Sequence, residues 1–185
     1  SKRMKIQSTP AWKADWKKWY SKIHANDLLK RWILDRGEQL GIRPDCTGSV
    51  IRSHEDIQAL SGTQKILIKA PFSTSGRHRI LIQNTPDSKA IEWISNHLNQ
   101  QIPLLAEAYL DKLADLSVHY QQTDTGLSKP EVTRFFTDNN GKYRATLVTR
   151  WDEKLPSEWL QSLHQFDRQP HWLQRVLESI GEHLS

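Results

Sequence analysis

The sequence predicts a mixed α+β fold, in which antiparallel hairpins pack with helices in two small lobes. Two pairs of apolar runs are each separated by a polar segment that contains glycine, a pattern typical of β-hairpins. Residues 66–68 pair with 80–82 around Gly76, and residues 135–136 pair with 143–149 around Gly141. Capped or amphipathic stretches, which predict helices, lie before, between and after these hairpins.

The first helix is expected from about Ala11 to His24. Trp12, Trp16 and Trp19 are spaced as i, i+4 and i+7, which places them on one face of a helix. Aromatic residues at this spacing usually dock against the protein's own core, so we expect this face to be buried.

A second helix is expected from Asn26 or Asp27 to Leu40. Either Asx residue is a good helix N-cap, and Gly41 is a typical C-terminal stop. Pro44 follows and prevents the helix from resuming.

The later elements follow in chain order. Ser53 and the acidic residues after it begin a helix that leads to Leu60. The other expected elements are a strand at 49–51, a hairpin at 66–82, a helix from 87 or 88 to 98, strands at 104–110 and 116–120, a hairpin at 135–149 and a final helix at 172–184. Boundaries between lobes are expected near 84–88 and near 110–115.

Composition indicates a globular protein of the cytoplasm. The 185 residues contain 25% charged side chains and no apolar run of the roughly 20 residues needed to span a bilayer. The segment Ser1–Lys5 lacks the apolar core of a secretory signal. The lone Cys46 cannot form a disulfide within one chain, fits a reducing compartment and is expected to be buried.

The chain has a net charge of +5, and the excess is concentrated in its first third. Residues 1–60 carry twelve Lys and Arg against seven Asp and Glu, a difference of five, whereas the remainder is balanced. Such a segment attracts polyanions, among them nucleic acids and nucleotide triphosphates, although a solvated surface is the simpler interpretation of so small an excess.

The hairpin at 66–82 carries the strongest functional pattern. Lys69 ends an apolar strand, and the small polar loop Ser73–Gly76 leads to the returning strand. Backbone N–H groups near a glycine can donate to phosphate oxygens, while a lysine supplies a fixed positive charge. This segment therefore predicts a phosphate-binding loop.

The order of these pieces resembles the ATP-grasp superfamily over about residues 21–128. The resemblance rests on a strand ending in Lys69, a small-residue loop, a returning strand, a helix, a strand ending in Glu107, and the motif Asp115-Leu-Ser-Val. ATP-grasp enzymes hold ATP between two α+β lobes and typically activate a carboxylate as an acyl phosphate for attack by a nucleophile. The resemblance implies an N-terminal helical segment at 1–48, an ATP-grasp small lobe with its phosphate lid at 49–110, and the start of the large lobe at 111–185.

The resemblance also implies a nucleotide-binding role for each matching residue. Lys69 would contact the α- and β-phosphates, and Glu107 would accept from the adenine amino group. Asp115 would take the ribose hydroxyls. Lys22 fits the position of a second phosphate-binding cation, with Lys30 and Arg31 as rivals. The lid and hinge residues would be Ser73, Thr74, Ser75, Gly76 and Arg77 for the lid, and Ala108, Tyr109 and Leu110 for the hinge.

Two departures from the family pattern bear on catalysis. His78 stands where the lid usually has a second glycine. The family's Mg²⁺ ligands come from a late pair of strands that this sequence does not show, and Asp152-Glu153 is acidic but lies in a predicted loop. We therefore expect an ATP-binding domain, incomplete at its C-terminal end, that would use Mg²⁺ in the complete protein and has no assigned catalytic residue.

Two other interpretations remain open. The chain is a nucleic-acid-binding module if the Trp face, with the lysines around it, stacks on bases. It is a degenerate relative if it kept the ATP-grasp fold and lost catalysis. The late arginines Arg134, Arg144 and Arg150 would meet phosphate or a substrate carboxylate, or lie unliganded on a strand surface. The partners expected are a nucleotide and an unidentified carboxylate, with nucleic acid less favoured and no membrane.

Overall fold

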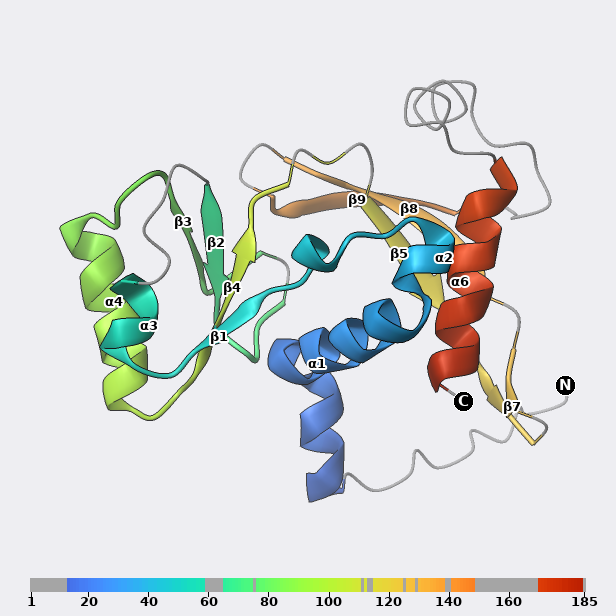
Figure 1. Cartoon of the computed structure of the whole chain (residues 1–185), viewed down its shortest axis with the longest axis horizontal. Coiled ribbons are helices and arrows are strands. Elements are labelled where there is room, and N and C mark those ends of the chain that lie inside the picture. Colours follow the sequence, from blue (N-terminus) through green and yellow to red (C-terminus); the bar gives the residue numbers. More distant parts are fainter. Residues whose placement is uncertain are drawn as a thin grey trace, which may run out of the picture.

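A computed structural model of the chain describes residues 13–58, 65–74, 76–110, 112, 115–124, 126–128, 130–138, 141–148 and 170–184. It is a mixed α+β structure with two antiparallel sheets and several helices, which confirms the predicted fold class at that level (Figure 1). Among the described residues, no helix combines the length and the apolar character needed to cross a membrane.

The first sheet has four antiparallel strands in the order β1-β4-β2-β3. Their bounds are β1 Ser49–Ile51, β2 Ile66–Lys69, β3 Arg79–Ile82 and β4 Leu104–Ala108. The predicted hairpin is confirmed, because Ile66 pairs with Ile82 and Lys69 pairs with Arg79. The register fixes which side chains share each face of the sheet.

One face of this sheet forms the larger apolar core. Ile51, Ile68 and Leu104 are at most 1% exposed, and they pack with Ala90 and Ile94 of α4 (Ser88–Asn99). The short α3 (His54–Gln58) lies on the same side (Figure 1). Since Ile82 of β3 and residues of α4 share this core, residues 84–88 connect a strand and a helix of one packed unit, and not two lobes as the sequence predicted.

Helix α4 begins where the sequence predicted. The side chain of Asp87 accepts a hydrogen bond from the backbone N–H of Ala90 at 2.7 Å, so Asp87 is the N-cap. A carboxylate at this position satisfies one of the orphan N–H groups of the first turn.

The second sheet has three antiparallel strands in the order β5-β8-β9. They are β5 Asp115–His119, β8 Glu131–Thr137 and β9 Tyr143–Val148. The predicted second hairpin is confirmed, with an irregularity in its register between Phe136 and Thr137. A small ribbon of β6 (Gln122–Thr123) and β7 (Gly126–Leu127) follows β5.

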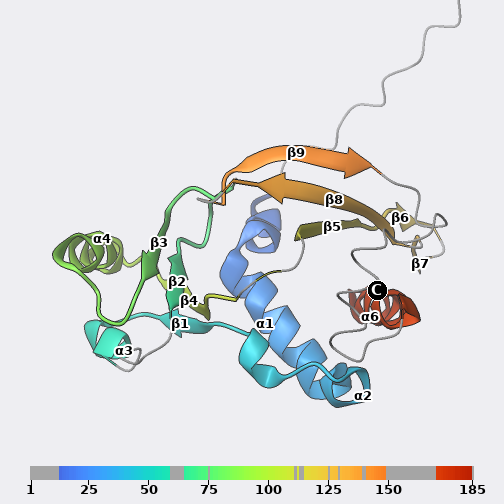
Figure 2. The ribbon, with the colours of Figure 1, turned by 90° about the horizontal axis from the view of Figure 1, so that it is seen from above.

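Helices from the two ends of the described chain form a second core below this sheet (Figure 2). Residues 22–40 form one continuous helical run, composed of α1 (Lys22–Trp32), a π-helical stretch η2 (Ile33–Gly37) and α2 (Glu38–Leu40). It packs against α6 (Pro170–Leu184). The indole N–H of Trp32 donates to Ser179 Oγ at 3.1 Å, and that of Trp172 donates to the carbonyl of Leu40 at 2.6 Å. Gly41, at φ 63°, ends the run as predicted.

The predicted boundary between the first two helices is wrong. The described residues of the first form a short 3-10 helix, η1 (Ala14–Tyr20), and α1 begins after Ser21, whose ψ of 124° interrupts the helix. Ser21 is the N-cap and accepts from the N–H of His24 at 3.5 Å. Asn26 lies inside α1, where its buried side chain bonds the N–H and C=O of Gly48.

Two predicted burials are also wrong. No residue of η1 is buried, and Trp19 is 58% exposed, so the described part of the Trp stripe does not dock on the core. Trp12 lies outside the described residues. Cys46, in the short 3-10 helix η3 (Pro44–Cys46), is exposed rather than buried.

Candidate functional site

A cleft of about 730 Å³ lies between the two sheets, where the chain passes from β4 to β5. Strands β2 and β3 form one wall, residues 107–110 and Lys112 the back, and the β8–β9 hairpin the other wall. The lining residues are Leu67, Lys69, Arg79, Leu81, Glu107, Ala108, Tyr109, Leu110, Lys112, Thr137, Asp138 and Gly141.

The strand register explains why these side chains meet. Lys69 is opposite Arg79, and Leu67 is opposite both Leu81 and Glu107. Residues opposite one another across antiparallel strands project from the same face. This is the face opposite to the one that packs on α4.

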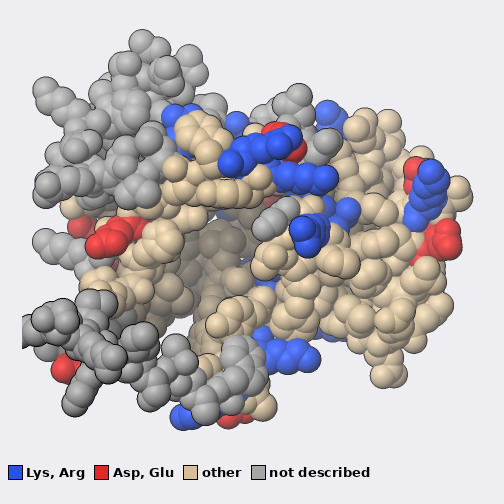
Figure 3. All heavy atoms as spheres, turned by 180° about the vertical axis from the view of Figure 1, so that it is seen from behind, with Lys and Arg blue, Asp and Glu red and all other residues tan. Residues whose placement is uncertain are grey.

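Figure 3 shows the back of the molecule, where Lys and Arg gather toward the middle and Asp and Glu lie mainly toward the edges.

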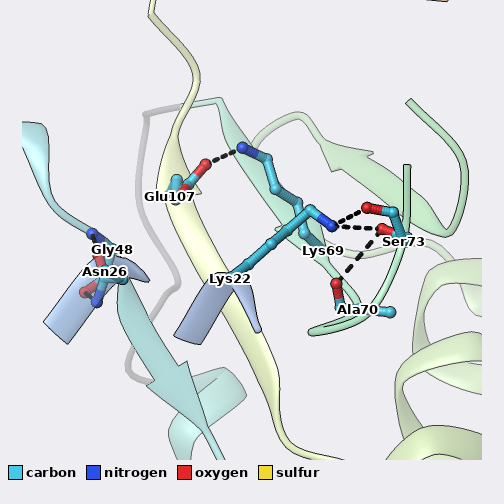
Figure 4. Close-up of polar contacts among 7 residues, drawn as sticks. All are labelled: Lys22, Asn26, Gly48, Lys69, Ala70, Ser73 and Glu107. Atoms are coloured by element: carbon cyan, nitrogen blue, oxygen red, sulfur yellow. Dashed lines mark hydrogen bonds and ion pairs between the residues drawn. The ribbon is translucent and has the colours of Figure 1, made fainter. Parts of the chain in front are cut away.

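Lys69 and Glu107 form an ion pair across β2 and β4 (Figure 4). Their side chains are 25% and 30% exposed, so the pair is partly shielded from water. Partial shielding strengthens an ion pair relative to one on the open surface. The Lys69 amine therefore lies in the cleft beside the carboxylate of Glu107, a residue that the sequence also assigned to the nucleotide site.

Lys22 enters the same region from the first turn of α1. Its amine donates to the backbone carbonyl of Ser73 and, at 2.8 Å, to Ser73 Oγ (Figure 4). The pKa of Lys22 is lowered, first by burial and then by the positive charge of Lys69, while Glu107 acts in the opposite direction. Lys22 and Lys69, which were predicted to bind the phosphates of one nucleotide, therefore lie close enough for their charges to interact.

The loop between β2 and β3 extends to the opposite wall. A Cβ added at Gly76, whose φ is 71°, would lie 2.6 Å from the carbonyl oxygen of Gly141 in the β8–β9 turn. Backbone hydrogen bonds fix the base of the loop, from Ala70 N–H to the His78 carbonyl at 3.0 Å and from Lys22 N–H to the Pro71 carbonyl at 2.9 Å. The loop thus contacts α1 at its base and approaches the β8–β9 turn at Gly76.

The described residues of the predicted lid form hydrogen bonds with Lys22 and within their own loop, and they do not line the cleft. Ser73 bonds Lys22, and the N–H of Arg77 donates to the Thr74 carbonyl at 3.1 Å. Ser73, Thr74, Gly76 and Arg77 do not line the cleft as it is shaped here, and Ser75 lies outside the described residues. His78, which stands where the ATP-grasp resemblance would place a second glycine, has a φ of 50°.

The predicted hinge residues lie at the back of the cleft. Tyr109 and Leu110 line it, and the N–H of Tyr109 donates to the Lys65 carbonyl at 2.8 Å. Asp115, the predicted ribose residue, does not line the cleft. It forms an ion pair with Lys112 and accepts from Thr137 Oγ1 at 3.1 Å. Both of these partners line the cleft.

Several residues of the cleft were not predicted from the sequence. Arg79 and Leu81 lie in β3, which the sequence predicted as a strand. Since Lys69 pairs with Arg79 and side chains alternate along a strand, Arg79 and Leu81 project from the same face of the sheet as Lys69. Thr137 and Asp138 come from the distant β8–β9 hairpin, and no local signal pointed to them.

The other candidate cations lie elsewhere. The Nε–H of Arg31 donates to the Asp27 carbonyl within α1, Arg134 lies over the Phe136 ring at 4.8 Å, and Arg144 forms a 3.1 Å ion pair with Asp138. Lys30, like Arg31, is on α1 and does not line the cleft. Arg150 lies outside the described residues.

A metal centre is not formed by the residues that the structure describes. Among them, no group of three or more His, Cys, Asp or Glu is arranged to hold an ion. Asp152 and Glu153 lie outside this part of the chain. Glu107 and Asp138, the carboxylates on the cleft surface, are each paired with a cation.

Comparison with known proteins gives no relative. No protein-family model matches the chain, and a search of curated proteins finds no significant match.

Proposed function

We propose that this chain is an ATP-grasp-like domain that binds an adenosine polyphosphate in the cleft between its two sheets. In the complete protein it would serve ATP-dependent activation of a carboxylate as an acyl phosphate. The observation that carries the proposal is the convergence of Lys69, Glu107 and the hinge residues 108–110 on one cleft, with Lys22 beside it. The order of residues along the chain alone singles out these groups.

The dimensions of the cleft suit a nucleotide. Small-molecule pockets commonly span roughly 300–1,000 Å³, and this cleft measures about 730 Å³. Apolar side chains of Leu67 and Leu81 on one wall offer a surface for a base, and cations lie near the β2–β3 loop.

Each end of the ligand has groups of matching chemistry. Lys69 and Lys22 supply positive charge for phosphates, and Arg79 adds a guanidinium that suits bidentate contact. Glu107 accepts from an adenine amino group, and backbone groups at 108–110 complete the base edge. Asp115 accepts hydrogen bonds from the ribose hydroxyls when these replace one of its present contacts with Lys112 and Thr137.

The loop Ser73–Arg77 would act as the lid. Ser73 Oγ and the backbone near Gly76 become phosphate donors when the Lys22–Ser73 contact is exchanged for a contact with the ligand. A closed lid excludes water and strengthens the charge interactions beneath it. Because the described residues do not form a metal centre, no Mg²⁺-dependent step is assigned to them.

Calorimetry with ATP and ADP tests the proposal. We expect binding, and we expect Lys69→Ala to weaken it by about 1.5–3 kcal/mol, the contribution of a hydrogen bond to a charged group. Lys89→Ala, a change at an exposed lysine of α4, is the matched control and should have no effect. The absence of binding heat at millimolar nucleotide would refute the proposal. Binding without phosphoryl transfer in the complete protein would identify a degenerate relative.

A further inference from the structure

The short helix η1 and the neighbouring loop residue Phe72 form an exposed surface of aromatic and cationic side chains. We call it the aromatic–lysine surface. It comprises Lys13, Lys17, Lys18, Trp19, Tyr20 and Phe72, together with the partly buried Trp16 under Lys13. Trp19 is 58% exposed, Tyr20 67% and Phe72 49%.

This surface is not part of either apolar core. None of the η1 residues is buried, and none belongs to the two hydrophobic clusters of the described chain. Large aromatic side chains held in water contribute little to folding, because their stabilising effect comes from burial. Their exposure together is typical of an interaction surface.

Lysines lie over the aromatic rings of the surface. The Lys13 amine is 6.0 Å from the Trp16 ring centroid, the Lys17 amine 5.2 Å from Phe72, and the Lys18 amine 5.0 Å from Trp19. Each of these three rings therefore has a cation over one of its faces. This is the combination that binds single-stranded nucleic acid, in which bases stack on aromatic faces and lysines neutralise the phosphates between them.

The charge around the surface favours a polyanion. The described residues 13–22 contain four lysines (Lys13, Lys17, Lys18 and Lys22) against the single acid Asp15. An acidic peptide would satisfy the lysines but would leave the aromatic faces without stacking partners. A nucleic-acid strand satisfies both.

We propose that the aromatic–lysine surface binds a single strand of nucleic acid, independently of the nucleotide cleft. It lies beside the lid, since the Lys22 N–H donates to the Pro71 carbonyl and Lys17 lies over Phe72. A bound strand would thus reach the same loop that closes over the cleft.

The test is fluorescence anisotropy with a labelled oligo-dT strand of about twelve nucleotides, a length within the usual site size. Oligo-dT contains no adenine, so it does not report on an adenine site. We expect binding at low salt and a log–log salt slope near −2, from about 0.7 per phosphate for three lysines on a single strand. Duplex DNA of equal length should bind at least several-fold more weakly.

Two matched pairs of variants separate stacking from charge. Trp19→Ala should weaken binding at least about fivefold, the lower end for one stacked base, whereas Tyr143→Ala, an exposed aromatic on β9, should not. Lys17→Gln with Lys18→Gln should weaken binding and flatten the salt slope, whereas Lys89→Gln should change neither. Lys69→Ala should leave strand binding intact. Circular dichroism checks that each variant folds.

Three results would overturn the proposal. These are no binding at low salt, equal losses for Trp19→Ala and Tyr143→Ala, and competition by poly-glutamate as effective as that by unlabelled strand. The last result would identify a general polyanion surface without stacking.

Discussion

The Lys69 amine and the Glu107 carboxylate form an ion pair between adjacent antiparallel strands, on the face of the first sheet that lines the cleft. The resemblance to ATP-grasp enzymes assigned Lys69 to phosphate and Glu107 to adenine, two ends of one ligand. A nucleotide bound as we propose would have to compete with Glu107 for the lysine. Glu107 would then affect both the strength and the selectivity of binding.

Glu107→Gln should reduce the preference for ATP over GTP. A carboxylate only accepts hydrogen bonds, which suits the adenine amino group, whereas an amide both donates and accepts and so tolerates the guanine carbonyl. We expect the preference to fall about tenfold or more, as for loss of a hydrogen bond to a charged group. Calorimetry with both nucleotides measures the change. Glu131→Gln, at an exposed position of β8, is the control. An unchanged ATP/GTP ratio would remove Glu107 from the base site.

Nucleotide affinity should decline at high pH, beginning below the usual lysine pKa of 10.5. Burial and the charge of Lys69 lower the Lys22 pKa in the unliganded protein, and a bound phosphate raises it again. Binding is then strongest below the lowered pKa and weakens as the pH rises through it, because Lys22 must regain its proton. Calorimetry across alkaline pH checks this.

Lys22→Arg separates this effect from general alkaline instability. Arginine keeps its charge throughout the range, so the part of the decline due to Lys22 should disappear. A pH profile identical to that of the unaltered protein would show that Lys22 does not contact the ligand.

Gly76→Ala should displace the lid from the β8–β9 turn. The new Cβ would lie 2.6 Å from the Gly141 carbonyl, too close to be accommodated without movement. We expect trypsin to cleave after Arg77 about 5–30 times faster, the factor for a loss of 1–2 kcal/mol. Mass spectrometry identifies the cleavage site.

Gly126→Ala is the matched control for the lid variant. Gly126 also has a positive φ, 120°, but an added Cβ there has nothing within 4 Å. It shares the backbone strain without the collision. Equal acceleration of cleavage after Arg77 in both variants would contradict the lid contact.

His78→Gly should stabilise the fold. His78 adopts φ 50°, a left-handed conformation that costs a non-glycine residue about 1–2 kcal/mol. Glycine relieves this strain and loses about 0.5–1 kcal/mol to its greater freedom when unfolded, so a small net gain remains. Urea unfolding measures it. His78→Ala keeps the strain and should show no gain, and a gain of equal size would attribute the effect to the imidazole instead.

Local patterns predicted the strands and hairpins, and long-range contacts explain most of what the sequence could not show. The hairpin of β2 and β3 was readable because its apolar runs and its turn are adjacent in the chain. Asn26 was predicted as a helix cap because an Asn side chain readily bonds the free N–H groups at the start of a helix. The same amide can instead bond the backbone of a distant loop, and the local sequence does not distinguish the two roles. Only Gly48, 22 residues away, reveals which role it has.

The Trp stripe failed for a different reason. Its described part, Trp16 and Trp19, is three positions apart and so keeps a common side of η1, a 3-10 helix with about three residues per turn. That side nevertheless packs into neither apolar cluster, and the spacing alone cannot show what a helix face packs against. Within the cleft, Lys69 and the hinge were identifiable from their order along the chain. Thr137 and Asp138 were not, since they reach the cleft only through the placement of the second sheet.

The contacts between α6 and the helical run at residues 22–40 constrain how this chain folds as it is synthesised. The first sheet has all its strands once residue 108 has left the ribosome. The Trp32–Ser179 and Trp172–Leu40 bonds span separations of 147 and 132 residues, so the apolar side of the early helices waits uncovered until the last helix emerges. Closure over such distances slows folding, and that interval is when a nascent chain of this protein is most exposed to aggregation or to chaperone capture.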